Sequence, residues 1–309
     1  MAARRSTRSS PCTRDSSDGH SLLELLLALS VVLVITGAAL SIALSANAQR
    51  ATDENRTAIN QNLRAALDLI GIEVRQAGQR LPGDFPAIEI VAGADGAPDT
   101  LILRRNLVDE VLPLCENLEA KTYDSEVSVA DSDPAAPPGC APLADDDGNG
   151  WPDNLDVWRD YRDESGGQVW AYVFSPVTGN GEWFLFDEDG DAQSIGNGND
   201  HPWAYAYGAA EQCRIYILEE RRYALREGLL GYQPGVGDDR EVRISAGITD
   251  FQARARLDDG SVLDRLDSTT RWTRLSAIEL SITGQSEFDG KTMTRTVNAR
   301  FFPRNVLSN

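Results

Sequence analysis

The chain has 309 residues, a formal net charge of −19 and a hydrophobic content of 41%. A chain of this length can hold one membrane segment together with one large domain or two small ones. The acidic excess argues against a nucleic-acid-binding protein, because phosphate backbones are bound by basic stripes, and it favours solubility and cation binding.

The first predicted element is a long apolar segment behind a basic leader. Residues 1–19 contain four arginines and two aspartates, and no residue from Leu25 to Ala48 is charged. About 20 apolar residues span a bilayer, and the arginines would hold the N-terminus in the cytoplasm. Glu24 lies inside this apolar segment. A carboxylate costs roughly 2.5–3.5 kcal/mol at the centre of a membrane helix, so this one needs a partner or a function.

Three interpretations of the apolar segment are open. A secretory signal peptide would be cleaved at Ala46-Asn47-Ala48, but the segment is longer than an ordinary apolar region of roughly 7–15 residues and contains Glu24. A plain membrane anchor accounts for the length and the basic leader but leaves Glu24 and Gly19 unexplained. The third interpretation rests on the stretch Gly19-His20-Ser21-Leu22-Leu23-Glu24, which resembles the processing site of type IV prepilins and of type II secretion pseudopilins.

This resemblance implies that a prepilin peptidase cuts the chain between Gly19 and His20 and that the new amino terminus is methylated. Glu24 would then be the glutamate at the fifth mature position. Its carboxylate would neutralise the terminal ammonium of a neighbouring subunit during assembly. His20 stands where the family usually has phenylalanine.

The pattern downstream predicts that the helix continues to Gly78. Apolar residues recur there at spacings of three and four, which is typical of an amphipathic helix: Ile59, Leu63, Leu67, Ile70 and Val74. Gly78 and the following Pro82-Gly83 predict the end of the helix. The apolar stripe would pack on a sheet, and a membrane helix broken from a second helix near Asn47 is the alternative.

Beyond Pro82 the periodicity changes to two, and the turns contain Gly, Pro, Asn and Asp. The pattern predicts strands at Ala87–Val91, Thr100–Arg104, Gln168–Phe174, Glu182–Phe186, Arg214–Glu220, Tyr223–Leu225, Glu241–Ser245, Thr249–Leu257, Leu275–Thr283 and Met293–Phe302. The turn at Thr178–Gly181 predicts a hairpin. The expected fold class is therefore α+β, with the long helix packed on an antiparallel sheet that carries a long loop insertion.

Several stretches of the body resemble the PilW family of minor pilins. They are Leu67–Gly78 at the end of the helix, Gly247–Gln252, Leu275–Ile282 and Arg295–Arg300. The resemblance implies a type IV pilin-like fold. It does not cover residues 106–210, where no resemblance to a known family is evident.

An acidic stretch in that middle segment fits the spacing of a twelve-residue calcium loop. The predicted ligands are the side chains at positions 1, 3, 5, 9 and 12 and the carbonyl at position 7: Asp145, Asp147, Asn149, Asp153, Asp156 and Trp151. Gly150 is the sharp-turn residue. Pro152 disfavours the usual exiting helix, so the pattern predicts a stand-alone calcium loop. The alternative is a solvated acidic turn.

Asp187–Asp191 matches the calcium-loop pattern less well. A hairpin turn is the preferred interpretation of this segment. Among the four cysteines, Cys115 and Cys140 are the predicted disulfide pair of an exported body, which would leave Cys213 over, although other pairings remain open. His201 is expected in a surface loop. The crowded tryptophans between 151 and 203 are expected in the sheet core, with an aromatic ligand-binding face as the alternative.

No motif for catalysis occurs in the chain, so the expected function is structural rather than enzymatic. The predicted domains are a cytoplasmic leader (1–19), a transmembrane or filament-core helix (20–48), its amphipathic continuation (49–80) and a β-rich pilin domain (81–309) with an insertion at about 106–210. The resemblance implies a minor pilin of a type IV pilus, stabilised by calcium. Expected partners are other major and minor pilins, the prepilin peptidase, the inner-membrane assembly platform and the membrane, but no nucleic acid.

The implied location is the inner membrane, crossed once with the body in the periplasm, and then the pilus at the cell surface. Two alternatives are open. The chain can be a J-type pseudopilin of a type II secretion system, or its body can be an adhesin or carbohydrate-binding module on a pilin stem.

Overall fold

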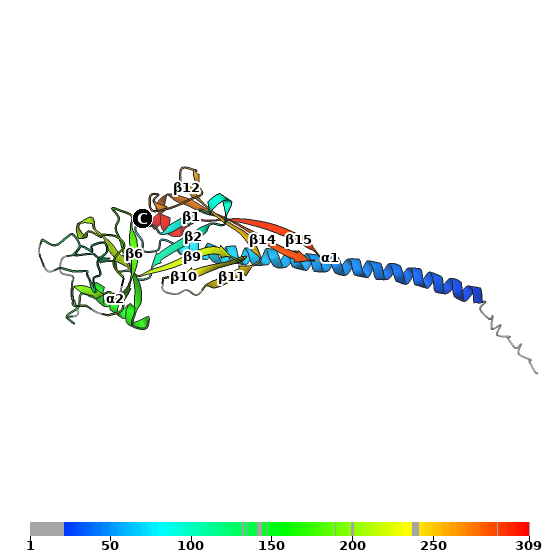
Figure 1. The fold of residues 1–309 in the computed structure, drawn as a ribbon, viewed down its shortest axis with the longest axis horizontal. Coiled ribbons are helices and arrows are strands. Elements are labelled where there is room, and N and C mark those ends of the chain that lie inside the picture. Colours follow the sequence, from blue (N-terminus) through cyan, green and yellow to red (C-terminus); the bar gives the residue numbers. More distant parts are fainter. Residues whose placement is uncertain are drawn as a thin grey trace, which may run out of the picture. The chain divides into compact units, whose positions relative to one another are not determined.

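One long helix begins the described part of the chain. The computed structural model describes residues 22–131, 133, 135–140, 144–146, 148–188, 190–198, 201–236, 241–288 and 290–308. Helix α1 runs from Leu22 to Gln76 and continues through Asn47, so the alternative of two helices broken there is not observed (Figure 1). Residues up to Glu54 form one unit by contacts, and residues from Asn55 onward form a second unit.

Within the second unit, the last part of α1 packs on the β-sheets through the predicted apolar stripe. Leu63, Leu67, Ile70 and Val74 are buried, and Ile59 is partly buried against the same core. The helix comes so close to strand β15 (Lys291–Phe301) that a Cβ atom at Gly71 would collide with the Phe301 ring. The stripe and its role in packing are therefore confirmed.

Helix α1 ends just before Gly78, as the pattern predicted. Gly78 has φ +77°, a left-handed conformation that favours glycine, and its N–H donates to the Arg104 carbonyl at 2.8 Å. A Cβ atom there would meet the indole ring of Trp272. The glycine therefore serves both the turn of the backbone and the close approach of the tryptophan.

We expect Gly78→Ala to lower the free energy of unfolding by about 2–4 kcal/mol, because backbone strain and overpacking add. Gly96→Ala is the matched control, since Gly96 has φ +79° with no neighbouring atom within 4 Å. It should cost only the backbone part, about 1 kcal/mol. Chemical denaturation of the full chain in detergent measures both, and equal losses would show that the Trp272 contact is unimportant.

Two antiparallel sheets pack with the helix around the first core. One has the order β1-β2-β9-β10-β11, and the other has the order β13-β12-β14-β15. The bounds are β1 Ile88–Val91, β2 Thr100–Asn106, β9 Leu218–Arg226, β10 Leu229–Pro234, β11 Val242–Ala246, β12 Ile248–Leu257, β13 Val262–Leu263 and β14 Leu275–Phe288. The alternation predicted for β14 is confirmed, because Ile278, Leu280 and Ile282 are all buried in this core.

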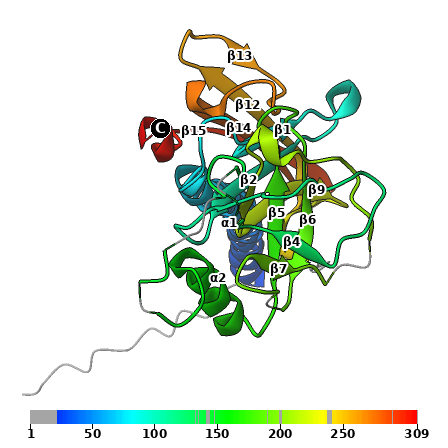
Figure 2. The ribbon, with the colours of Figure 1, turned by 90° about the vertical axis from the view of Figure 1, so that its left-hand side faces the viewer.

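The middle of the chain forms a second core and not a long loop. Its buried residues lie between Val108 and Ile217. They come from the sheet β3-β8-β5-β6, the pair β4-β7, helix α2 and the segments between these elements; Figure 2 labels α2, β4, β5, β6 and β7. The bounds are β3 Leu112–Pro113, β4 Glu126–Ser128, β5 Val169–Phe174, β6 Gly181–Phe186, β7 Ser194–Gly196, β8 Arg214–Tyr216 and α2 Asp153–Glu164. The predicted α+β class with antiparallel strands is observed, but the single sheet is not. Besides the predicted β5 and β6, the insertion contains β3, β4, β7 and α2, which the sequence did not indicate.

The sheet β3-β8-β5-β6 separates the two cores. Alternate residues of a strand face opposite sides of a sheet. In β8 Tyr216 belongs to the first core and Ile215 to the second, and in β5 Tyr172 and Val173 divide in the same way. Both cores therefore share this sheet, which joins the middle segment firmly to the rest of the second unit.

Most predicted strands are present with small differences at their ends, and the hairpin between β5 and β6 is confirmed. The segment Arg214–Glu220 is not one strand. It divides at Ile217 into β8 and β9, which belong to different sheets. Strand β10 was missed because Gly231 and Pro234 weaken its pattern. Four short 3₁₀ helices complete the described elements: Ala94–Gly96, Ala209–Glu211, Trp272–Arg274 and Arg304–Ser308.

Ion pairs connect the end of helix α1 to strands β2 and β9. Arg221 of β9 contacts Glu73 of the helix at 2.5 Å, and Arg105 of β2 bonds to Glu219 and to Gln76. Burial raises the pKa of Glu73, although the charge of Arg221 opposes that effect. These half-buried polar contacts fix the position of the helix end on the two strands, where the other contacts are apolar.

Candidate functional site

The first candidate site is the N-terminal part of helix α1. Gly19 and His20, the predicted cleavage and methylation residues, lie outside the described residues. Glu24 lies in the first turn of the described helix. The apolar side chains that follow it are exposed, among them Leu25, Leu33 and Leu44. In the described part of the chain, α1 is the helix that is long and apolar enough to cross a membrane, as membrane anchors and signal sequences are.

Leucine and valine side chains that are exposed on all sides of a helix are unfavourable in water. This part of α1 therefore needs a lipid or protein environment. Glu24 is the one acidic residue in that apolar stretch. A carboxylate carried into such an environment needs a cationic partner or a proton. The segment therefore has the composition of a membrane anchor or of a signal sequence, with one acidic residue near its start.

The second candidate site is the acidic loop before helix α2. The two carboxylate oxygens of Asp145 accept hydrogen bonds from the N–H groups of Asn149 and Gly150, at 3.1 and 3.0 Å. The Asn149 amide donates to Asp156 at 2.7 Å, and Asp153 accepts from the Asp146 N–H at 3.1 Å. The loop thus curls so that the fifth position contacts the first and the twelfth, while the ninth position contacts the second.

The described part of the chain contains no group of three or more His, Cys, Asp or Glu residues arranged to hold a metal. Asp147, the predicted ligand at position 3, lies outside the described residues. Trp151, whose carbonyl is the predicted ligand at position 7, bonds through its N–H to Asn149 at 2.7 Å, and its ring lies 4.0 Å from the Arg159 guanidinium. The Asp145 carboxylate is engaged within the loop, and the Asp156 carboxylate accepts hydrogen bonds from Asn149 and, at 3.0 Å, from Arg159 of α2.

The expectation that Pro152 would prevent an exiting helix was wrong. Helix α2 begins at Asp153, directly after Pro152. Proline is tolerated at the start of a helix, because its missing N–H has no partner there in any case. Asp153 and Asp156 lie in the first turn, where negative charge is favourable. A helix therefore follows the loop, whereas the described residues just before the loop are not helical.

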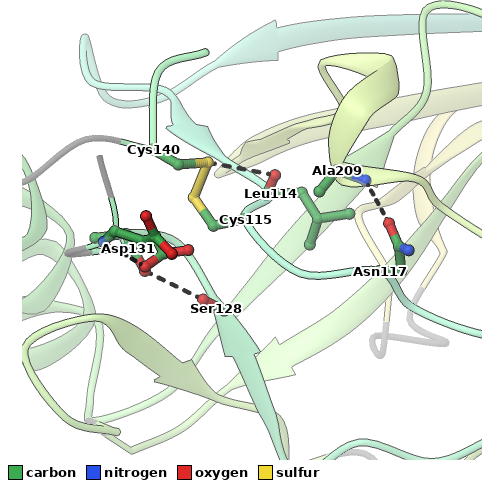
Figure 3. Close-up of a disulfide and its surroundings, with 9 residues drawn as sticks. Leu114, Cys115, Asn117, Ser128, Asp131, Cys140 and Ala209 are labelled. Atoms are coloured by element: carbon green, nitrogen blue, oxygen red, sulfur yellow. Dashed lines mark hydrogen bonds between the residues drawn. A yellow bond between two sulfur atoms is a disulfide. The ribbon is translucent and has the colours of Figure 1, made fainter. Parts of the chain in front are cut away.

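The third feature is a disulfide in the middle segment. Cys115 and Cys140, the pair suggested by the sequence, form a disulfide across 25 residues (Figure 3). A loop of that length stabilises by about 3.5 kcal/mol in the chain-entropy model. Both ends are also tied by backbone hydrogen bonds, from Cys115 to Ser128 and from Asp131 to Cys140. Cys213 is a buried thiol whose pKa is raised by burial.

The remaining predicted features are structural. Asp191 accepts from the Gln193 N–H and the Ser194 hydroxyl, which makes a turn of that weaker acidic stretch, although Asp189 is outside the described residues. Trp158 and Trp203 are buried in the second core and do not form an exposed aromatic face. His201 is exposed.

No family model, curated protein or solved structure matches this chain. Two polar features escaped the sequence analysis. One is the buried cluster around Arg104, and the other is a pocket beside Arg214 and Tyr216. Their residues come from strands that are distant in the sequence, so no local pattern could have indicated them.

Proposed function

We propose that this chain is a minor pilin, similar to the PilW family, which is inserted in a membrane and assembled into a type IV pilus. The observation that carries the proposal is the placement of Glu24 at the start of one continuous helix whose first part is apolar and exposed. Its last part is the packing stripe of an antiparallel β body. A plain anchor needs neither the glutamate nor the packed continuation.

In this proposal a prepilin peptidase cuts after Gly19, and the amine of His20 becomes methylated. Glu24 neutralises the amine of a neighbouring subunit, and the apolar helices pack together in the filament. An ion pair in an apolar surrounding is favourable only when both charges find each other, so the pair selects correctly seated subunits. The body requires no catalytic residue for this role.

Mass spectrometry of the mature N-terminus tests the proposal. The expected product begins at a methylated His20. An intact N-terminus would favour the plain anchor, and a product that begins at Gln49 would favour the signal peptide, so either result would overturn the pilin proposal. A J-type pseudopilin would give the same product as a minor pilin. Recovery of the chain in sheared surface pili, rather than with the secretion apparatus, distinguishes these two.

The acidic loop is proposed to bind calcium and to stabilise the middle segment. Support comes from the ligand spacing, from the curled loop and from the helix that follows it. The carboxylates of Asp145, Asp153 and Asp156 are the residues that would supply charge to the ion. Calcium would also offset the mutual repulsion of these acidic side chains.

Calcium should raise the melting temperature of the full chain. At millimolar calcium, a site of the affinity usual in extracellular modules would stabilise the fold by about 1–2 kcal/mol, or about 3–6 °C. Asp145→Ala should remove this shift. Asp160→Ala is the control, because Asp160 is an exposed acid of α2 outside the loop. Equal melting temperatures in calcium and in chelator would contradict calcium binding.

A further inference from the structure

A pocket of about 440 Å³ lies beside the edge strand β3, where the second core meets the first. Its polar lining consists chiefly of Asn154 at the start of α2 and of Arg214 and Tyr216 in β8. Pro82, Val111 and Pro113 supply apolar walls. The size of this pocket lies in the range of small-molecule sites, and its lining combines apolar walls with polar groups.

Two buried polar atoms of this lining have no hydrogen-bond partner. They are the hydroxyl of Tyr216, a fully buried residue, and the Oδ1 atom of Asn154. A buried polar group without a partner costs stability, which a bound molecule with matching groups would restore. Both atoms therefore indicate a ligand that offers hydrogen bonds.

Arg214 is the charged residue among the described lining residues of the pocket. Among the described lining residues there is no aspartate or glutamate, although the whole chain has a net charge of −19. Arg214 is half-buried and forms no ion pair in the described part of the chain. Burial raises the pKa of Tyr216 to about 12, with Arg214 opposing this effect and the charge of Asp84 adding to it, so the hydroxyl stays protonated and can donate at neutral pH.

We propose that this pocket binds a small carboxylate ligand that also carries a hydroxyl or amide N–H donor. Arg214 and the Tyr216 hydroxyl would bind the carboxylate, because charge-assisted hydrogen bonds of this kind are the strong ones. Asn154 Oδ1 would accept from the donor group, and the proline and valine walls would cover the apolar part. The terminal uronic acid of a glycan and the C-terminal residue of a peptide share this chemistry.

The disulfide supports one wall of the same pocket. Pro138 and Gly139, which precede Cys140, line it together with Leu114, which precedes Cys115. The Cys140 sulfur lies 3.6 Å from the Leu114 carbonyl oxygen (Figure 3), and Ala209 is another lining residue. Reduction of the disulfide would release this wall, so ligand affinity should fall under reducing conditions.

Saturation-transfer NMR titrations on the full chain in detergent test the proposal. The probes are glucuronate and N-acetyl-alanyl-alanine, each compared with a neutral counterpart, glucose and the dipeptide amide. We expect one acid to bind in the millimolar range and its neutral counterpart at least about tenfold more weakly, which corresponds to one charged hydrogen bond. The acid that binds identifies the source of the ligand.

Arg214→Ala should weaken binding of that acid at least about tenfold, and Tyr216→Phe should weaken it while preserving the buried ring. Arg226→Ala is the matched control, because Arg226 is an exposed arginine of β9 outside the pocket. Circular dichroism verifies that each variant is folded. Failure of both acids to bind, equal binding of the neutral probes, or unchanged affinity in a folded Arg214→Ala variant would overturn the proposal.

Discussion

Replacing Glu24 with alanine is expected to exclude the chain from pili while leaving it in the membrane. The substitution removes the charge from an otherwise apolar stretch, so membrane insertion becomes easier rather than harder. The subunit's partner ammonium would then be left unpaired in an apolar surrounding. If the free energy of assembly becomes less favourable by more than about 1.4 kcal/mol, incorporation into the pilus falls more than tenfold. Immunoblots of membrane and sheared-pilus fractions from the native host measure it.

Glu24→Gln separates charge from size. It keeps the shape of the side chain and removes the charge, so it should fail in assembly as alanine does. Ser30→Ala is the matched control on the same helix, because the Ser30 hydroxyl bonds only to the Leu27 carbonyl of its own turn at 2.8 Å. Normal incorporation of both Glu24 variants would contradict the proposed ion pair and, with it, the assembly role of this residue.

Helix α1 could be predicted because its signals are local. The apolar stripe that includes Leu63 and Ile70 has the period of a helix, and Gly78 terminates it through a backbone conformation that few other residues adopt. Strands such as β12 and β14 alternate cleanly because one face of their sheet is buried. In both cases the burial of one face leaves its period in the sequence.

The second core could not be predicted for a physical reason. Its strands β3, β4 and β7 are two or three residues long, too short for a period to be visible. Strands β5 and β8 could be predicted as extended apolar segments, but residues on both of their faces are buried, so no alternation indicates which core each residue faces. The division between β8 and β9 follows from the sheets that each strand joins and not from any break in local composition.

The candidate sites also differ in whether their residues are neighbours in the sequence. The acidic loop could be identified as a candidate because all its residues lie within a dozen positions, and Glu24 because it interrupts an apolar stretch, while their roles stay predictions. The pocket at Arg214 combines residues from β8, α2 and the segment after α1. Only strand pairing brings such groups together, so their arrangement becomes visible only in the folded chain.

The second large effect is expected from Arg104→Met. Arg104 is buried in β2 and bonds to Glu220 at 2.6 Å and to Glu89 at 2.8 Å. Burial lowers its pKa, but the charges of those two glutamates raise it further, so the guanidinium stays charged. Its removal leaves the buried carboxylate of Glu220 without its main partner. Because an uncompensated buried charge is costly, the free energy of unfolding should fall by about 3–5 kcal/mol.

Denaturant titration of the full chain in detergent measures the loss. The control Arg254→Met breaks an ion pair with Asp264 in which both side chains are mostly exposed, so it should cost no more than about 1 kcal/mol. Arg104→Met combined with Glu220→Gln should be less destabilised than the sum of the two single variants, because the second change removes the stranded charge. A loss for Arg104→Met no larger than the control's would mean that Arg222, which also contacts Glu220, compensates the buried charge alone.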